Sequence, residues 1–81
     1  PTVEMAVSDL GSGMAAFVMF VRAGLASSNG EARRLIRGGG ARLNDETIRD
    51  ENVSVTASDS DIEGLIKLSA GKKRHALVRL K

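Results

Sequence analysis

Basic side chains in two short segments are the residues whose type and spacing predict chemistry in this chain. The first segment holds three arginines within five positions and the second holds three consecutive bases: Arg33, Arg34, Arg37, Lys72, Lys73 and Arg74. A guanidinium presents a planar fork of donors that matches phosphate oxygens, and an ammonium binds phosphate as a point charge. The pattern therefore favours binding of a polyanion over catalysis.

Charge is segregated along the chain, although the formal net charge is only +2. Residues 22–49 carry six arginines against three acids, residues 50–64 carry five acids and no base, and residues 67–81 carry six Lys and Arg residues and no acid. If the two basic blocks meet in the fold, they form a positive surface that attracts polyanions whatever the net charge.

Other kinds of site find little support in the sequence. There is no cysteine, which excludes disulfides and thiolate metal sites, and the single histidine, His75, lacks the partners of a ligand set or a catalytic triad. Residues 59–64 resemble the opening of a calcium loop, but Ala70 stands where a bidentate glutamate is required. The longest apolar run, residues 14–21, is far shorter than the roughly 20 residues of a membrane span, so we expect no membrane partner.

Two helices must hold the first arginine cluster. Apolar residues at helical spacing predict a first helix over residues 14–23, with Gly24 as a left-handed cap. Ser28 and Glu31 have the spacing of a capping box that begins a second helix. On that helix, Ala32 and its apolar neighbours form one arc, the three arginines lie on the opposite side, and three glycines, 38–40, end the helix.

Beyond the glycines the pattern changes to strands. Residues 41–43 and 47–48 flank an Asn44-Asp45 turn, residues 53–56 form a short strand, and residues 65–68 and 76–80 form a hairpin around a basic turn. We therefore expect an α+β domain with two N-terminal helices packed on a small, mainly antiparallel β-sheet. Residues 1–12 are expected to be a flexible lead-in or linker, residues 13–81 are expected to form the domain, and the Pro1 start suggests an excised module.

The aromatic content narrows the expected ligand. There is no Trp or Tyr, and both phenylalanines lie in the apolar first helix, where we expect Phe17 in the core and Phe20 in the core or against a further domain. A single-strand binder needs exposed aromatic rings on which bases stack. The sequence therefore predicts contacts to the backbone of a folded RNA, with no DNA partner.

The segment from Ser28 to Asn44 resembles the small RNA-binding domain named after small-subunit ribosomal protein S-four. The matching positions are Ser28, Glu31, Ala32, Arg33, Leu35, Ile36, the glycines, Ala41, Leu43 and Asn44. In that family the two helices and the following hairpin (the alpha-L motif) face RNA, which implies RNA contacts at Ser28, Asn29, Arg33, Arg34, Arg37 and Arg42. Asn29 stands where many members carry a base, and Asp45 stands where glycine is common.

Within that family, the chain is most similar to the C-terminal domain of bacterial-type tyrosyl-tRNA synthetases, including the basic turn with Lys72, Lys73 and Arg74. The resemblance implies binding of the tyrosine tRNA near its variable arm and anticodon stem. It places ATP, tyrosine and magnesium in a separate catalytic domain, leaves no cofactor to this chain, and implies a cytoplasmic location, or the mitochondrial matrix for an organellar enzyme.

Two alternatives stay open from the residues themselves. In the first, the chain is the RNA-binding domain of a pseudouridine synthase or of a ribosome-associated quality-control protein. In the second, the chain is a protein–protein module that docks through the acidic 50–64 segment or the first helix. A strong salt dependence of RNA binding separates the first alternative from the second.

Overall fold

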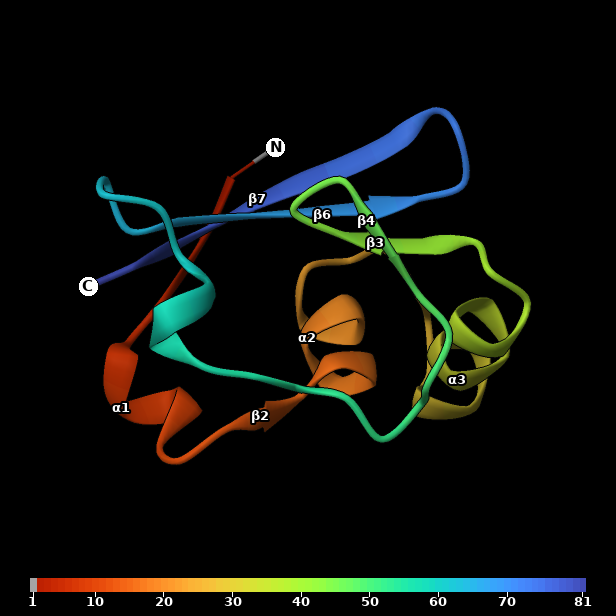
Figure 1. Cartoon of the computed structure of the whole chain (residues 1–81), viewed down its shortest axis with the longest axis horizontal. Helices are drawn as coiled ribbons and strands as arrows, with labels where there is room; N and C mark the ends of the chain where they lie inside the picture. The colour runs from red at the N-terminus through yellow and green to blue at the C-terminus, as the bar shows by residue number, and fades with distance from the viewer. Residues whose placement is uncertain (1) are drawn as a thin grey trace.

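The computed structural model describes residues 2–81 and confirms the α+β class. Its elements in chain order are β1 (Thr2–Met5), α1 (Val7–Leu10), β2 (Met14–Ala15), α2 (Ala16–Arg22), α3 (Asn29–Arg37), β3 (Ala41–Leu43), β4 (Glu46–Ile48), β5 (Ser54–Val55), the 3-10 turn η1 (Ala57–Asp59), β6 (Leu65–Ala70) and β7 (Arg74–Leu80). Within residues 2–81, one sheet has the five-strand order β1-β7-β6-β3-β4, and β2 pairs with β5. The three α-helices lie on one side of the large sheet (Figure 1).

The large sheet is mainly antiparallel, as expected. The β3–β4 and β6–β7 hairpins and the β3–β6 pair are antiparallel, whereas β1 runs parallel to β7. The β6–β7 hairpin agrees with the sequence prediction, with residues 71–73 as its turn. The helices cover one face of the sheet, so the residues that point to the other face form an open, solvated surface.

The amino-terminal segment differs from the expected lead-in. Residues 2–5 form the edge strand β1, with Thr2 opposite Leu77, and residues 7–10 form α1; Pro1 lies outside the described residues. Met5 and Leu10 are only 3% and 2% exposed, so their burial draws this segment into the fold. A turn follows α1 at Gly11, and the Gly13 amide donates to the Leu10 carbonyl at 2.7 Å.

The core lies between the helices and the inner face of the sheet. Its largest fully buried side chains come from both layers: Phe20, Leu10, Met19, Ile36, Ile66, Leu68, Val55 and Val78. The expected first helix begins two residues later than predicted, at Ala16, because residues 14–15 pair with β5 as the strand β2. A short apolar run is compatible with a helix or a strand, and here the pairing with β5 makes residues 14–15 a strand.

Glycine ends both long helices in the same way. Gly24 and Gly39 have φ values of +81° and +79°, and the amides that follow them, of Leu25 and Gly40, donate to Phe20 and Leu35 carbonyls. The amides of Gly24 and Gly39 themselves donate to the Val21 and Ile36 carbonyls. These two hydrogen bonds at each helix end define the Schellman cap, in which glycine adopts the left-handed conformation at little cost. The predicted cap at Gly24 and the predicted glycine stop are therefore confirmed.

The Asn44-Asp45 turn connects the β3–β4 hairpin to the neighbouring strand. Both residues have positive φ, 52° and 71°, which is the conformation of a two-residue hairpin turn. The Asn44 amide also donates from Nδ2 to the Asp59 carbonyl at 2.6 Å and accepts from the Lys67 backbone amide at 2.9 Å. The asparagine thus fixes the hairpin against β6.

Candidate nucleic-acid interface

The start of α3 is held by two neighbouring serines rather than by a complete capping box. The Ser28 hydroxyl accepts from the Glu31 backbone amide at 3.1 Å, as predicted. The Glu31 carboxylate, however, accepts from the Ser27 hydroxyl at 2.6 Å and the Ser27 amide at 3.4 Å, not from the Ser28 amide. The reciprocal bond was therefore predicted one residue too late, because the extended backbone at Ser28 brings Ser27 within reach of the glutamate.

The Glu31 carboxylate at this cap is influenced by positive charges from two different elements. The hydrogen bonds from Ser27 lower the pKa of Glu31 below its ordinary value, and the positive charges of Arg74 and Arg34 act in the same direction. Arg74 comes from β7, so the electrostatic effect reflects its position close to the amino-terminal part of α3. The helix terminus itself also favours a negative side chain in the first turn.

The two faces of α3 separate as the sequence predicted. Ala32 and Ile36 are completely buried and Leu35 is partly buried, whereas the arginines of the helix are exposed: Arg33, Arg34 and Arg37. Nine residues of helix, with the Schellman stop behind them, hold these side chains in fixed relative positions. Asn29 is the first residue of α3 and is exposed, on the same end of the helix as Ser28.

Phe17 corrects an expectation about the core. Phe20 is fully buried, but Phe17 is only partly buried and its ring lies under an arginine. The Cζ atom of Arg33 is 4.3 Å from the centroid of this ring, a distance at which the ring face attracts a cation. Phe17 therefore packs against the edge of the core and also places its ring beneath Arg33.

The basic turn between β6 and β7 contacts the helical layer. The Arg74 guanidinium donates to the Gly24 carbonyl at 3.2 Å, and the Gly71 amide donates to the Gly40 carbonyl at 2.8 Å. Lys72 and Lys73 are exposed at the tip of this turn. The two clusters that lie far apart in sequence are thereby placed at the same end of the molecule, where Figure 1 shows α3 and the β6–β7 turn.

We call this combined surface the basic ridge, defined by Arg33, Arg34, Arg37, Lys72, Lys73 and Arg74. Most of its charge is uncompensated: among the residues that the structure describes, Arg37 is the one member with an ion-pair partner. Such a set of fixed, exposed cations is suited to several phosphates of one polyanion.

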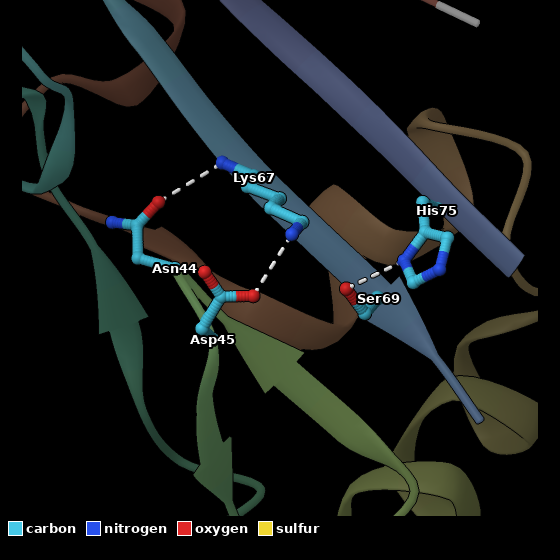
Figure 2. A network of polar contacts seen from close by, with 5 residues as sticks. All are labelled: Asn44, Asp45, Lys67, Ser69 and His75. Atoms are coloured by element: carbon cyan, nitrogen blue, oxygen red, sulfur yellow. Dashed lines mark hydrogen bonds and ion pairs between the residues drawn. The ribbon is translucent and has the colours of Figure 1, made fainter. Parts of the chain in front are cut away.

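The open face of the sheet differs from the ridge. Figure 2 shows Lys67 engaged at both ends: its amide donates to Asn44, and its ammonium lies 2.9 Å from an Asp45 carboxylate oxygen. The hydrogen bond from Lys67 lowers the pKa of Asp45. Just past the end of β7 the Lys81 ammonium lies 2.8 Å from the Glu4 carboxylate of β1, so two of the cations on this face are paired with acids.

Arg42 and His75 belong to this open face. Arg42 is opposite Ser69 on β6, and Ser69 is opposite His75 on β7. The His75 Nδ1 and Ser69 Oγ atoms are 2.9 Å apart (Figure 2), which satisfies the buried serine hydroxyl. His75 is thus a strand residue, and Arg42, for which the resemblance implied an RNA contact, lies on the open face of the sheet instead of beside the α3 arginines.

Two residues near the end of α3 were missed from the sequence. A Cβ atom on Gly39 would lie 2.9 Å from the Arg49 guanidinium, so Arg49 lies directly across this glycine. Glu51 reaches the same region, with its Oε2 atom 3.1 Å from Nε of Arg37. The only sequence signal was the lack of a side chain at Gly39, which leaves room for a long neighbour.

The calcium-like segment uses its carboxylates within the backbone. Asp59 accepts from the Thr56 amide at 2.9 Å, and Asp61 accepts from the amides of Glu63 and Leu65 at 2.8 and 3.0 Å. Across residues 2–81, no cluster of three or more His, Cys, Asp or Glu side chains is arranged to hold a metal ion. In the same part of the chain, no helix is long and apolar enough to cross a membrane.

The helices, the sheet order and the β3–β4 hairpin give the S-four-like α+β architecture that the sequence indicated. The chain matches the family described as the tyrosine–tRNA ligase SYY-like C-terminal domain over residues 1–78. Because this match covers nearly the whole chain, the chain belongs to that family.

Curated relatives agree with this family. The chain is 51% identical over 79 residues to the tyrosine–tRNA ligase of Nitrobacter winogradskyi and 49% identical over 79 residues to that of Bartonella quintana, in each case covering 98% of this chain. A tyrosine–tRNA ligase of Rickettsia massiliae is 49% identical over 80 residues, which cover 99% of this chain. The chain spans about a fifth of the length of these relatives. Of the parents that the sequence left open, these matches favour the ligase.

Proposed function

We propose that this domain binds the tyrosine tRNA through phosphate contacts of the basic ridge and so supports aminoacylation by another part of the parent chain. The family points to this RNA, since its relatives carry the name tyrosine–tRNA ligase. The observation that carries the proposal is the contact of Arg74 with the Gly24 carbonyl just after α2, because it holds the basic turn against the helical layer that also carries the α3 arginines.

The contacts proposed are to the variable arm and anticodon stem region of a folded tRNA. Within residues 2–81, both phenylalanines are covered, Phe20 by the core and Phe17 by Arg33, so stacking of splayed bases has no platform. Arginine forks and lysine ammonium groups instead fit the phosphates of a folded backbone. DNA is not a proposed partner.

The division of labour follows from the same proposal. The ATP, tyrosine and magnesium of aminoacylation belong to the catalytic part of the parent, and the ridge contributes affinity and orientation of the tRNA. We place the parent enzyme in the cytoplasm, with the mitochondrial matrix as the location of an organellar form.

Salt dependence of tRNA binding tests this function. With about five phosphate contacts, log affinity falls linearly with log salt at a slope near −4. The double substitution Arg33→Ala plus Arg37→Ala should make the slope shallower by about 2, since each cation neutralises about one phosphate. An affinity independent of salt, or unchanged in the double variant, contradicts the proposal, and contacts confined to residues 50–64 would instead support protein docking.

A further inference from the structure

Two arginines one helical turn apart on the ridge are held in opposite ways. Arg33 lies against the Phe17 ring, which attracts the cation through its quadrupole and leaves the positive charge in place. Arg37 is paired with the Glu51 carboxylate at 3.1 Å, so its charge is compensated in the free chain. On the same helix, therefore, one guanidinium is open to an anion and the other already holds one.

The position of Glu51 is fixed by the connection between β4 and β5. Asp50 Oδ1 accepts from the Asn52 amide at 2.9 Å, the Asp50 carbonyl accepts from the Val53 amide at 3.1 Å, and the Val53 carbonyl accepts from Ala16 at the start of α2. This turn presents Glu51 to the last turn of α3. The glutamate side chain is 32% exposed and Arg37 is 59% exposed, so the pair remains accessible to a competing anion.

We infer that Glu51 is a built-in substitute for an RNA phosphate, which occupies Arg37 until a tRNA phosphate replaces it. The inference rests on the proposed function. A guanidinium donates from the same N–H groups to a carboxylate or to a phosphate, so the two anions compete for Arg37. Only an RNA whose backbone brings a phosphate to this position recovers the lost pair, whereas a polyanion that does not reach it meets the repulsion of Glu51.

This role predicts a discrimination that the free cations cannot provide. Arg33, Arg34 and the turn lysines attract any polyanion, and their contribution carries no information on shape. Glu51 adds a penalty that a correctly placed phosphate offsets, and specificity is set by such differences. Arg49, across Gly39 at the same end of α3, adds positive charge beside the exchange position.

A double-mutant cycle tests the exchange. We expect Glu51→Gln to bind tyrosine tRNA about two- to fivefold more tightly, the range of an exposed ion pair. Asp50→Asn is the matched control, because it removes the same charge one residue away and keeps an oxygen acceptor for Asn52. The control should gain less than Glu51→Gln, and in an Arg37→Ala background the two substitutions should have equal effects.

Several results would overturn the inference. Equal gains for Glu51→Gln and Asp50→Asn, or a gain that persists without Arg37, would show only general repulsion. Weaker binding by Glu51→Gln would show that the glutamate positions Arg37 for RNA. In the unaltered chain the Arg37 Nε–H resonance should shift when tRNA is added, and an unshifted resonance beside shifted ridge resonances also contradicts exchange.

The proposed function and the inference fail in different ways. If the unaltered chain shows no salt-dependent tRNA binding, the proposed function fails and the inference fails with it. If the chain binds with the expected slope but the cycle shows no coupling between Glu51 and Arg37, the function stands and the exchange alone is rejected.

Discussion

The basic ridge and the open face of the sheet both carry several cations, yet their surroundings differ. On the ridge, Arg34, Lys72 and Lys73 have no ion-pair partner among the described residues, whereas on the sheet Lys67 and Lys81 are paired with Asp45 and Glu4. The number of positive charges is therefore a poor guide to a polyanion site. Whether each cation is paired with an acid, and how rigidly its supporting element holds it, are the better guides.

The largest expected difference is in tRNA affinity, between matched triple substitutions on the ridge and on the open face. We compare Arg34→Ala, Lys72→Ala and Lys73→Ala on the ridge with Lys67→Ala, Arg79→Ala and Lys81→Ala on the sheet. Each set removes the same formal charge. At about 0.1 M salt, the ridge set should lower tRNA affinity about 100-fold or more, from roughly one phosphate contact per cation, and the sheet set less than about tenfold. Equal losses in a filter-binding or anisotropy titration would mean that only net charge matters.

The helix cap beneath the ridge gives the next largest effect. Ser28→Ala removes the acceptor of the Glu31 amide and should lower the free energy of unfolding by about 1 kcal/mol, measured by urea denaturation. Ser28→Asn keeps an acceptor and should stay near the unaltered chain. If the alanine variant loses tRNA affinity without losing stability, Ser28 contacts RNA directly and its main role is not the cap.

Removing the ring beneath Arg33 should have a smaller effect. Phe17→Leu keeps an apolar side chain in a partly buried position but removes the aromatic face, so tRNA affinity should fall about two- to fivefold. Arg33→Ala in the same background should then cost less affinity than it does alone. Additive losses at the two positions would show that the ring does not orient the guanidinium.

The smallest expected effect is a loss of folding stability at low pH from the Asp45–Lys67 pair on the open face. The Lys67 hydrogen bond lowers the pKa of Asp45 below its ordinary value of 3.8, so the carboxylate is favoured in the folded state. The resulting stabilisation is fully present above the ordinary pKa and is lost as the pH falls through the lowered one. Urea denaturation between about pH 5 and pH 2 should show a shallower decline for Asp45→Asn than for the unaltered chain. Parallel declines would exclude a contribution from this pair.

Local signals in the sequence were sufficient for the elements that support the ridge. The second helix, its Ser28 cap, the glycine stops and the two hairpins depend on residues close together in sequence, and each is confirmed. The roles of β1, Phe17 and Glu51 depend on partners from other elements. Thr2 of β1 lies opposite Leu77, the Phe17 ring lies under Arg33, and Glu51 is paired with Arg37.

The site shows the same division between local and distant information. The opposed arcs of α3 followed from its helical period, and the basic ridge required the further fact that the Arg74 turn meets the Gly24 carbonyl. No period or spacing could have shown that Arg37 is paired while Arg34 is free, or that Arg42 points to the other face of the sheet. Charge compensation depends on side chains that the fold brings together.

Mapping of amide chemical shifts on addition of tyrosine tRNA tests the central claim most directly. The account predicts that the shifted amides cluster in residues 28–40 and 71–74, with little change along β1 and around the Asp45–Lys67 pair. The ridge positions should lose their shifts as salt is raised, because phosphate contacts are screened and displaced. Shifts confined to residues 50–64 or to the open face of the sheet would contradict the account.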